Sequence, residues 1–140
     1  MIELVLGGNK SGKSDFGLEL LRREPEPWVL VATGKSRDLA FRDQIREHRL
    51  GREAGIAVHE TDTDLVGTLR ALSPRGGGVL VDSLDFWMFA VMNQPGGREA
   101  LERMREELLA ELSAWRGGRL ILVSTEMGLG PLAFDGSVRA

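Results

Sequence analysis

Hydrophobic residues along this chain gather in short runs that are separated by longer, mixed polar and apolar stretches. Five of the runs are rich in valine, isoleucine and leucine and predict β-strands: IELVL (2–6), WVLVAT (28–33), IAVHE (56–60), GVLVDS (78–83) and RLILVST (119–125). Most of them are almost continuously apolar, which is typical of strands in a parallel sheet that helices cover on both faces.

Two of the stretches between these runs show clear helical periodicity. The longer one has an apolar residue at every third or fourth position, namely Leu101, Met104, Leu108, Leu112 and Trp115. Gly117-Gly118 follow it and predict the stop of the helix. The shorter one begins after residues 61–63 and places Leu65, Leu69 and Leu72 on one face.

The alternation of strands and helices predicts an α/β fold, with a mostly parallel sheet flanked by helices and ligands at the carboxyl ends of the strands. Residues 1–140 contain no repeat or linker and are predicted to form a single domain. The Gly-Gly-Gly at 76–78 is interpreted as an ordinary helix-to-strand connection.

Composition narrows the function classes only slightly. The formal charge of −3 argues against broad binding to nucleic acid, and the absence of cysteine excludes disulfides and thiolate metal sites. No apolar run approaches the roughly 20 residues that span a bilayer, and the N-terminus lacks a signal-peptide pattern. We therefore expect a cytoplasmic protein with no membrane span and no nucleic-acid partner.

The segment GGNKSGKS (7–14) connects the first apolar run to a stretch in which Phe16, Leu20 and Leu21 recur at helical spacing. Its spacing is G-x-x-x-x-G-K-[ST], in which backbone N–H groups surround a phosphate, the lysine reaches the outer phosphates and the serine ligates magnesium. The positive end of the following helix dipole points at the same anion. The predicted nucleotide-binding residues are Gly7, Gly8, Asn9, Lys10, Ser11, Gly12, Lys13 and Ser14.

A glycine-rich turn with a solvated lysine is the alternative interpretation of this segment. It accounts for the glycines but not for the Lys13-Ser14 pair. Of 18 basic residues in the chain only Lys10, Lys13 and Lys35 are lysines, so two lysines in one loop indicate a local requirement. The motif and its strand–helix context together favour a site for a nucleoside triphosphate, ATP or GTP.

Two acidic residues follow predicted strands. Asp82 ends GVLVD, where nucleotide-binding folds place the acid that holds Mg²⁺ together with the loop serine, here Ser14. Alternatively, Asp82 caps a helix that begins at 83–85. Glu126 ends RLILVSTE before two spaced glycines, where it faces a nucleotide or a second substrate, or else belongs to a simple turn.

The chain has two histidines. His59 lies inside the run IAVHE and is interpreted as a half-buried strand residue. His48 lies in the polar, arginine-rich segment IREHRLGRE, where it is either a surface residue or a nucleophile toward phosphorus, for which a neutral imidazole with a pKa near about 6.5 is suited. The pattern alone leaves both readings of His48 open.

Five stretches, taken in order, resemble the bifunctional adenosylcobinamide kinase / adenosylcobinamide-phosphate guanylyltransferase family of cobalamin biosynthesis. They are LVLGGNKSGKS, VLVATGKSRD, EHRLGRE, VLVDSLDFWM and ILVSTEMGLG. The last is similar to a strand and turn that are fairly specific to the family, whereas the phosphate-binding loop alone is shared with many unrelated families.

The resemblance implies a P-loop protein of RecA-like α/β fold that forms homotrimers. It implies phosphorylation of the aminopropanol hydroxyl of adenosylcobinamide by ATP or GTP, and then transfer of GMP from GTP through a guanylylated histidine. The H-x-x-G-R pattern of the family is matched by His48, Gly51 and Arg52, so His48 and Lys13 are the implied catalytic residues. Thr33, Arg52, Glu60, Asp82 and Glu126 complete the predicted nucleotide site.

The chain also departs from the family pattern. Glu47 stands where the family often has a second histidine, and Ala40 and Gln44 stand at positions that are acidic or arginine in the family. Family chains continue beyond Gly130 with a helix and a strand, so we expect a C-terminally shortened member. Two alternatives remain open, namely a different P-loop small-molecule kinase and a shortened homologue that binds GTP without turnover.

Overall fold

The computed structural model describes residues 1–7, 12–33 and 56–125. The strands of the described residues are β1 (Ile2–Gly7), β2 (Trp28–Thr33), β3 (Ile56–Thr61), β4 (Gly78–Asp82) and β5 (Leu120–Thr125). The helices of the same residues are α1 (Lys13–Arg22), α3 (Leu65–Leu72), α4 (Leu84–Met92) and α5 (Gly97–Ser113).

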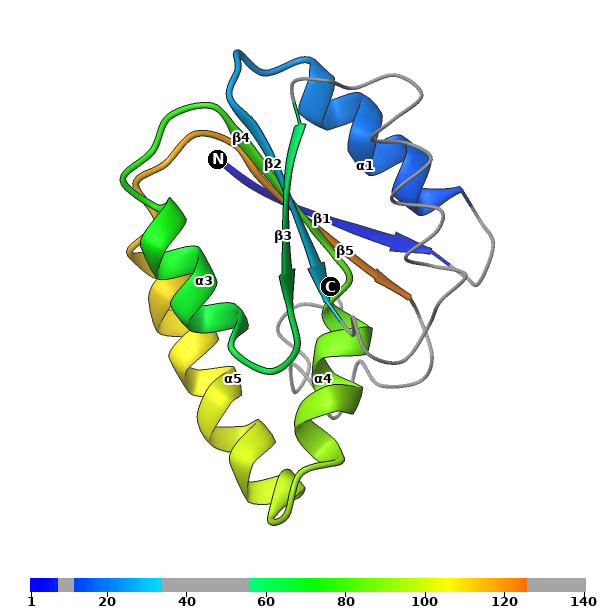
Figure 1. The fold of residues 1–140 in the computed structure, drawn as a ribbon, viewed down its shortest axis with the longest axis vertical. Coiled ribbons are helices and arrows are strands. Elements are labelled where there is room, and N and C mark those ends of the chain that lie inside the picture. The colour runs from blue at the N-terminus through cyan, green and yellow to red at the C-terminus, as the bar shows by residue number, and fades with distance from the viewer. Residues whose placement is uncertain (8–11, 34–55, 126–140) are drawn as a thin grey trace.

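The five strands form one sheet in the order β1-β5-β4-β2-β3, and each neighbouring pair is parallel (Figure 1). Each strand begins and ends within one residue of the range predicted from the sequence. The prediction of an α/β fold with a mostly parallel sheet is thereby confirmed. Strands β1 and β3 form the two edges.

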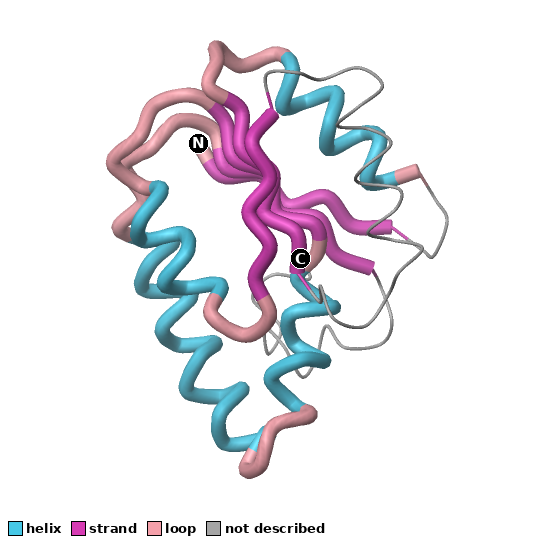
Figure 2. The backbone as a smooth tube through the Cα atoms, viewed as in Figure 1, coloured by secondary structure: helices cyan, strands magenta, loops and turns pink. Residues whose placement is uncertain are grey.

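Helices cover both faces of this sheet, with α1 on one face and α3, α4 and α5 on the other (Figure 2). The apolar cluster beneath α1 consists of Leu18, Leu20, Leu21, Leu30, Ile56, Leu80, Ile121 and Val123. A larger cluster, which includes Val31, Leu69, Val81, Trp87 and Leu108, fills the space between the sheet and the other three helices.

The apolar faces of the two periodic helices agree with the prediction. In α3 the residues Leu65 and Leu69 are fully buried, and in α5 Leu108 is buried. The predicted stop at Gly117-Gly118 is wrong, because α5 ends at Ser113. The indole N–H of Trp115 donates to the carbonyl oxygen of Gly118 at 2.8 Å, so the chain has already turned toward β5 before the glycines.

Two side chains are more exposed than their patterns indicate. His59 was interpreted as half-buried, but it is exposed. It aligns with Val31 of β2 and so shares that residue's face, but β3 is an edge strand, and the apolar cluster on this face includes no residue of β3. Phe16 is 49% exposed because α1 turns Gly17 toward the sheet in its place.

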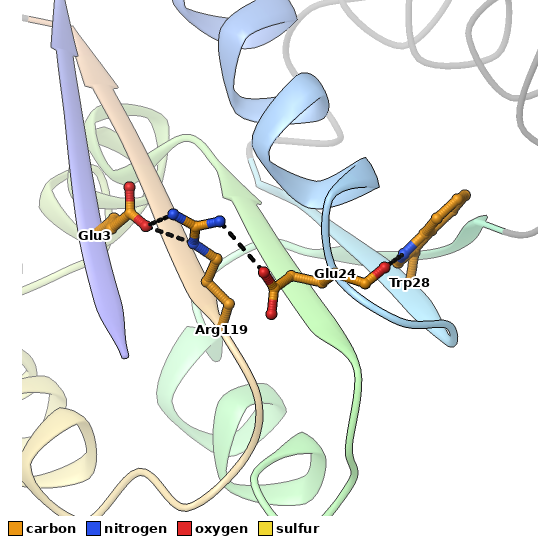
Figure 3. A network of polar contacts seen from close by, with 4 residues as sticks. All are labelled: Glu3, Glu24, Trp28 and Arg119. Carbon is orange, nitrogen blue, oxygen red and sulfur yellow. Dashed lines mark hydrogen bonds and ion pairs between the residues drawn. The ribbon is translucent and has the colours of Figure 1, made fainter.

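The amino end of the sheet is held by an ion-pair network around Arg119 (Figure 3). The guanidinium of Arg119 binds the carboxylate of Glu3 on β1 and, at 3.2 Å, the carboxylate of Glu24 in the α1–β2 connection. The indole of Trp28 donates to the carbonyl oxygen of Glu24 at 2.7 Å. These contacts join the beginnings of β1, β2 and β5 at the end of the sheet opposite the predicted site.

A third tryptophan, Trp87 on α4, donates its indole N–H to the carbonyl oxygen of Thr63 at 2.8 Å. Each of the three tryptophans therefore holds the backbone of a connection between elements. No helix among the described residues has both the length and the apolar character needed to cross a bilayer.

Candidate active site

The phosphate-binding loop connects the last residue of β1, Gly7, to the first residue of α1, Lys13. Gly12 occupies the N-cap position of α1 with φ of 83°, a left-handed conformation that favours glycine. The N-cap residue itself is a glycine and has no side chain with which to cap this helix end. Backbone N–H groups of the first turn are thus directed toward the position where the motif places a phosphate.

Helix α1 lies unusually close to the sheet at Gly17. A Cβ atom built on this glycine would be 2.9 Å from Leu80 Cδ1 on β4 and 3.1 Å from Val123 Cγ2 on β5. Gly17 therefore sets the height of the helix above the two strands that carry the neighbouring part of the site. The sequence signal for this role, which the predicted site residues do not include, is a lone glycine inside a helical pattern.

A row of aligned residues crosses the sheet near its carboxyl edge. Strand pairing places Val5, Val123, Asp82, Ala32 and Glu60 in register on five successive strands. Val5 and Val123 belong to the cluster beneath α1, so the whole row faces that helix. Asp82 and Glu60 are two strands apart, about 10 Å at the usual strand spacing, and the small side chain of Ala32 lies between them.

Asp82 thus lies on the same face of the sheet as α1, whose first turn carries Ser14. The alternative, in which Asp82 caps the following helix, is not favoured, because the N-cap residue of α4 is Ser83. Asp82 is only 7% exposed, so its carboxylate is mostly shielded from bulk water. The peptide bond between Asp82 and Ser83 is cis.

Thr33 lies at the carboxyl end of β2 and is fully buried. Its hydroxyl donates to the carbonyl oxygen of Ser83 at 2.5 Å and accepts the N–H of Ser83 at 2.9 Å. The structure therefore places Thr33 beside Asp82, and the involvement of Ser83 was missed in the sequence interpretation.

The predicted residues that the structure describes all lie at the carboxyl edge of the sheet: Gly7, Gly12, Lys13, Ser14, Thr33, Glu60 and Asp82. The remaining predicted residues lie outside the described residues: Gly8, Asn9, Lys10, Ser11, His48, Arg52 and Glu126. A separate pocket of about 360 Å³ lies at the amino end of the sheet. It is lined by Met1, Glu24, Gly117, Gly118 and Arg119.

The donor atoms at the carboxyl edge suit a magnesium–nucleotide complex. Ser14 offers a hydroxyl and Asp82 a carboxylate, both hard oxygen ligands of the kind that Mg²⁺ prefers. Within residues 1–7, 12–33 and 56–125, no group of three or more His, Cys, Asp or Glu side chains could enclose a metal by itself.

A glycine-rich loop that leads from a parallel strand to a helix starting Lys-Ser, and an acid on the same face of the sheet, define a P-loop nucleotide-binding α/β protein. Within that class, the model of the cobinamide kinase / cobinamide phosphate guanyltransferase family matches residues 3–139, and the chain belongs to this family. It is thereby a transferase of the bifunctional kinase and guanylyltransferase type.

A curated relative agrees with this assignment. The bifunctional adenosylcobalamin biosynthesis protein CobP of Pseudomonas aeruginosa is 37% identical over 136 residues, which cover 93% of this chain and 74% of the relative. Both findings confirm the family resemblance that the five sequence segments indicate.

Proposed function

We propose that this chain phosphorylates adenosylcobinamide with ATP or GTP and then transfers GMP from GTP to the resulting phosphate. The observation that carries the proposal is the common face of α1 and Asp82. It brings Lys13, Ser14 and a shielded carboxylate to one edge of the sheet in a member of this family.

In the first reaction, an acceptor hydroxyl attacks the γ-phosphorus and a nucleoside diphosphate leaves. Lys13 binds the outer phosphates, and the N–H groups of the first turn of α1 contribute the positive end of the helix dipole. Ser14 and Asp82 would hold Mg²⁺, which supplies neutralisation of the charge on the phosphates when it is bound. Most of the catalysis in this step is positioning and charge stabilisation.

In the second reaction, we assign the nucleophile to His48. Its imidazole attacks the α-phosphorus of GTP and pyrophosphate leaves, and the cobinamide phosphate then takes the GMP and releases the histidine. The support for this step is the match of His48 and Arg52 to the H-x-x-G-R pattern. The imidazole must be unprotonated, so guanylylation is expected to fall as the pH drops through the pKa of the histidine, which is about 6.5 for an unperturbed imidazole.

Labelling with α-³²P-GTP tests the second reaction. The wild type, His48→Ala and His59→Ala are incubated with the label, and the modified peptide is mapped. His59 is a matched control because it is an exposed imidazole on the edge strand β3. Loss of label in His48→Ala alone is expected. Label that survives in His48→Ala and disappears in His59→Ala would overturn the assignment.

Triphosphate binding by Lys13→Ala tests the phosphate site. Loss of a charge-assisted contact of about 1.5–3 kcal/mol should raise the Kd for ATP or GTP about 10- to 150-fold. Arg23→Ala is the control, because Arg23 is an exposed cation just beyond the other end of α1. Equal affinity in both variants would remove Lys13 from the site.

The two alternatives are separated by the same samples. Acceptor phosphorylation from γ-labelled ATP without any histidine label would favour a P-loop kinase of another kind. Tight GTP binding without phosphorylation or label would favour a homologue without turnover. We further propose that the protein works in the cytoplasm as a homotrimer, and light scattering coupled to gel filtration tests the trimer.

A further inference from the structure

The hydroxyl of Thr33 is fully engaged in the backbone where β4 passes into α4. It is 0% exposed, and its single proton is donated to the carbonyl oxygen of Ser83. A threonine hydroxyl has only one proton to donate. Thr33 therefore has none to offer a nucleotide phosphate, although it lies in the region where the sequence predicts a nucleotide contact.

The Thr33 hydroxyl takes the place of the backbone hydrogen bonds that end with the β2–β4 ladder. Strands β2 and β4 pair in parallel register up to Ala32 and Asp82, and β4 ends there. Ser83 follows at once and is 3% exposed, so its backbone N–H and C=O need partners within the protein. The Thr33 hydroxyl serves both groups, and so extends the hold of β2 on this chain by one residue beyond the ladder.

The consequence falls on Asp82. The ladder fixes its backbone on the amino side, and Thr33 fixes the next residue, so the chain is held on both sides of the carboxylate. The carbonyl oxygen of Ser83 also accepts the backbone N–H of Trp87 on α4 at 3.3 Å. The Thr33 hydroxyl is the contact that ties Ser83 back to β2, so without it the strand–helix junction loses this tie to the sheet. Small displacements of a ligating group are costly because metal and phosphate geometry is narrow.

The geometry points to Thr33 as a positioning residue, whose hydroxyl holds Asp82 in the place from which it ligates the nucleotide-bound Mg²⁺. The inference rests on the proposed function, because it takes the metal role of Asp82 from there. In this proposal Thr33 influences the binding of the metal through Asp82 and does not contact the nucleotide directly.

Three variants test it. Thr33→Val keeps the branched shape but removes the hydroxyl, and Thr33→Ser keeps the hydroxyl. Thr61→Val is the matched control, because Thr61 is a buried threonine in register with Thr33 on β3, which does not pair with β4. Two readouts are used: Mn²⁺ binding in the presence of a non-hydrolysable ATP analogue, followed by electron paramagnetic resonance, and the Mg²⁺ concentration that gives half-maximal kinase activity.

Thr33→Val is expected to weaken Mn²⁺ binding and to raise the half-saturating Mg²⁺ at least fivefold, while analogue affinity without metal stays within twofold. Thr33→Ser and Thr61→Val should both stay within twofold of the wild type. Normal Mn²⁺ binding in Thr33→Val, or an equal defect in Thr33→Ser, would overturn the inference. So would an unfolded Thr33→Val beside a folded Thr61→Val, since the role would then be purely structural. A wild type that binds no metal–nucleotide would instead defeat the proposed function itself, and the inference with it.

Discussion

Replacing Gly17 by alanine tests whether the close approach of α1 to the sheet is required. The new methyl group would lie 2.9 Å from Leu80 Cδ1 and 3.1 Å from Val123 Cγ2. Both contacts are tighter than normal carbon–carbon packing. Leu80 and Val123 are themselves fully buried, so making room displaces further core side chains or lifts the helix.

Two opposing terms decide the stability of Gly17→Ala. Alanine is the better helix former by about 1 kcal/mol. Overpacking of a well-filled core costs about 1–3 kcal/mol. The balance is a net loss of roughly 0–2 kcal/mol, and we expect a loss of about 1 kcal/mol. A glycine in an exposed helix would show the opposite sign.

Urea unfolding followed by circular dichroism measures this balance, with the midpoint compared at constant slope. The Kd for triphosphate should rise in the same variant, because Lys13 and Ser14 move with α1. A double-mutant cycle with Leu80→Val isolates the contact, since valine lacks the carbons that the new methyl group meets. We expect a coupling of at least about 0.5 kcal/mol in favour of the double variant. Stabilisation by Gly17→Ala, or simple additivity in the cycle, would refute the reasoning.

Two further predictions concern stability away from the nucleotide. The carboxylate of Asp64 caps α3 by accepting the N–H of Gly67 at 3.0 Å. Asp64→Ala should therefore lower the free energy of unfolding, measured with urea, by about 1 kcal/mol, while Asp64→Asn stays near the wild type. Equal losses in the two variants would argue against the cap. Arg119→Ala leaves Glu3 and Glu24 without their shared partner and should lower the free energy of unfolding by about 1.5–3 kcal/mol. Arg23→Ala, which removes an exposed ion pair, should cost no more than about 0.5 kcal/mol, and similar losses for the two arginines would contradict this view of the network.

The strands were predictable because a parallel sheet covered on both faces requires continuous apolar runs, and most of the runs here have that character. The order of the strands in the sheet could not be predicted in this way, because it depends on crossover connections between residues far apart in the sequence. His59 illustrates the difference. Its run indicates a strand, but its exposure follows from the position of β3 at an edge.

Helix α4 shows a second limit of the pattern. Its sequence LDFWMFAVM is apolar on nearly every side, because the helix packs against both the sheet and α5. Such a helix shows no single apolar face, so periodicity does not reveal how it is oriented. Helix α1 shows a different limit. Phe16 matches the apolar spacing of its helix but remains exposed, so the spacing alone did not identify the buried face.

For the site, the sequence identifies residues whose chemistry is required by type. Lys13, Ser14 and Asp82 carry the charge or the ligand atoms that the proposed magnesium–nucleotide complex would require. Gly17 and Thr33 act through partners on other strands, and Thr33 is 50 residues from Ser83. Only the folded sheet brings such pairs together, so their roles could not be derived from local spacing.

The placement of the three indoles gives this protein a built-in set of optical reporters. Trp28 and Trp115 each hold a connection at the amino end of the sheet, whereas Trp87 holds the backbone of Thr63, which follows the carboxyl end of β3. Variants that keep one tryptophan at a time would separate emission from the two ends. A change in emission confined to Trp87 would then report on the carboxyl end of the sheet, where the nucleotide is proposed to bind. The emission of Trp28 and Trp115 would report the unfolding of the amino end.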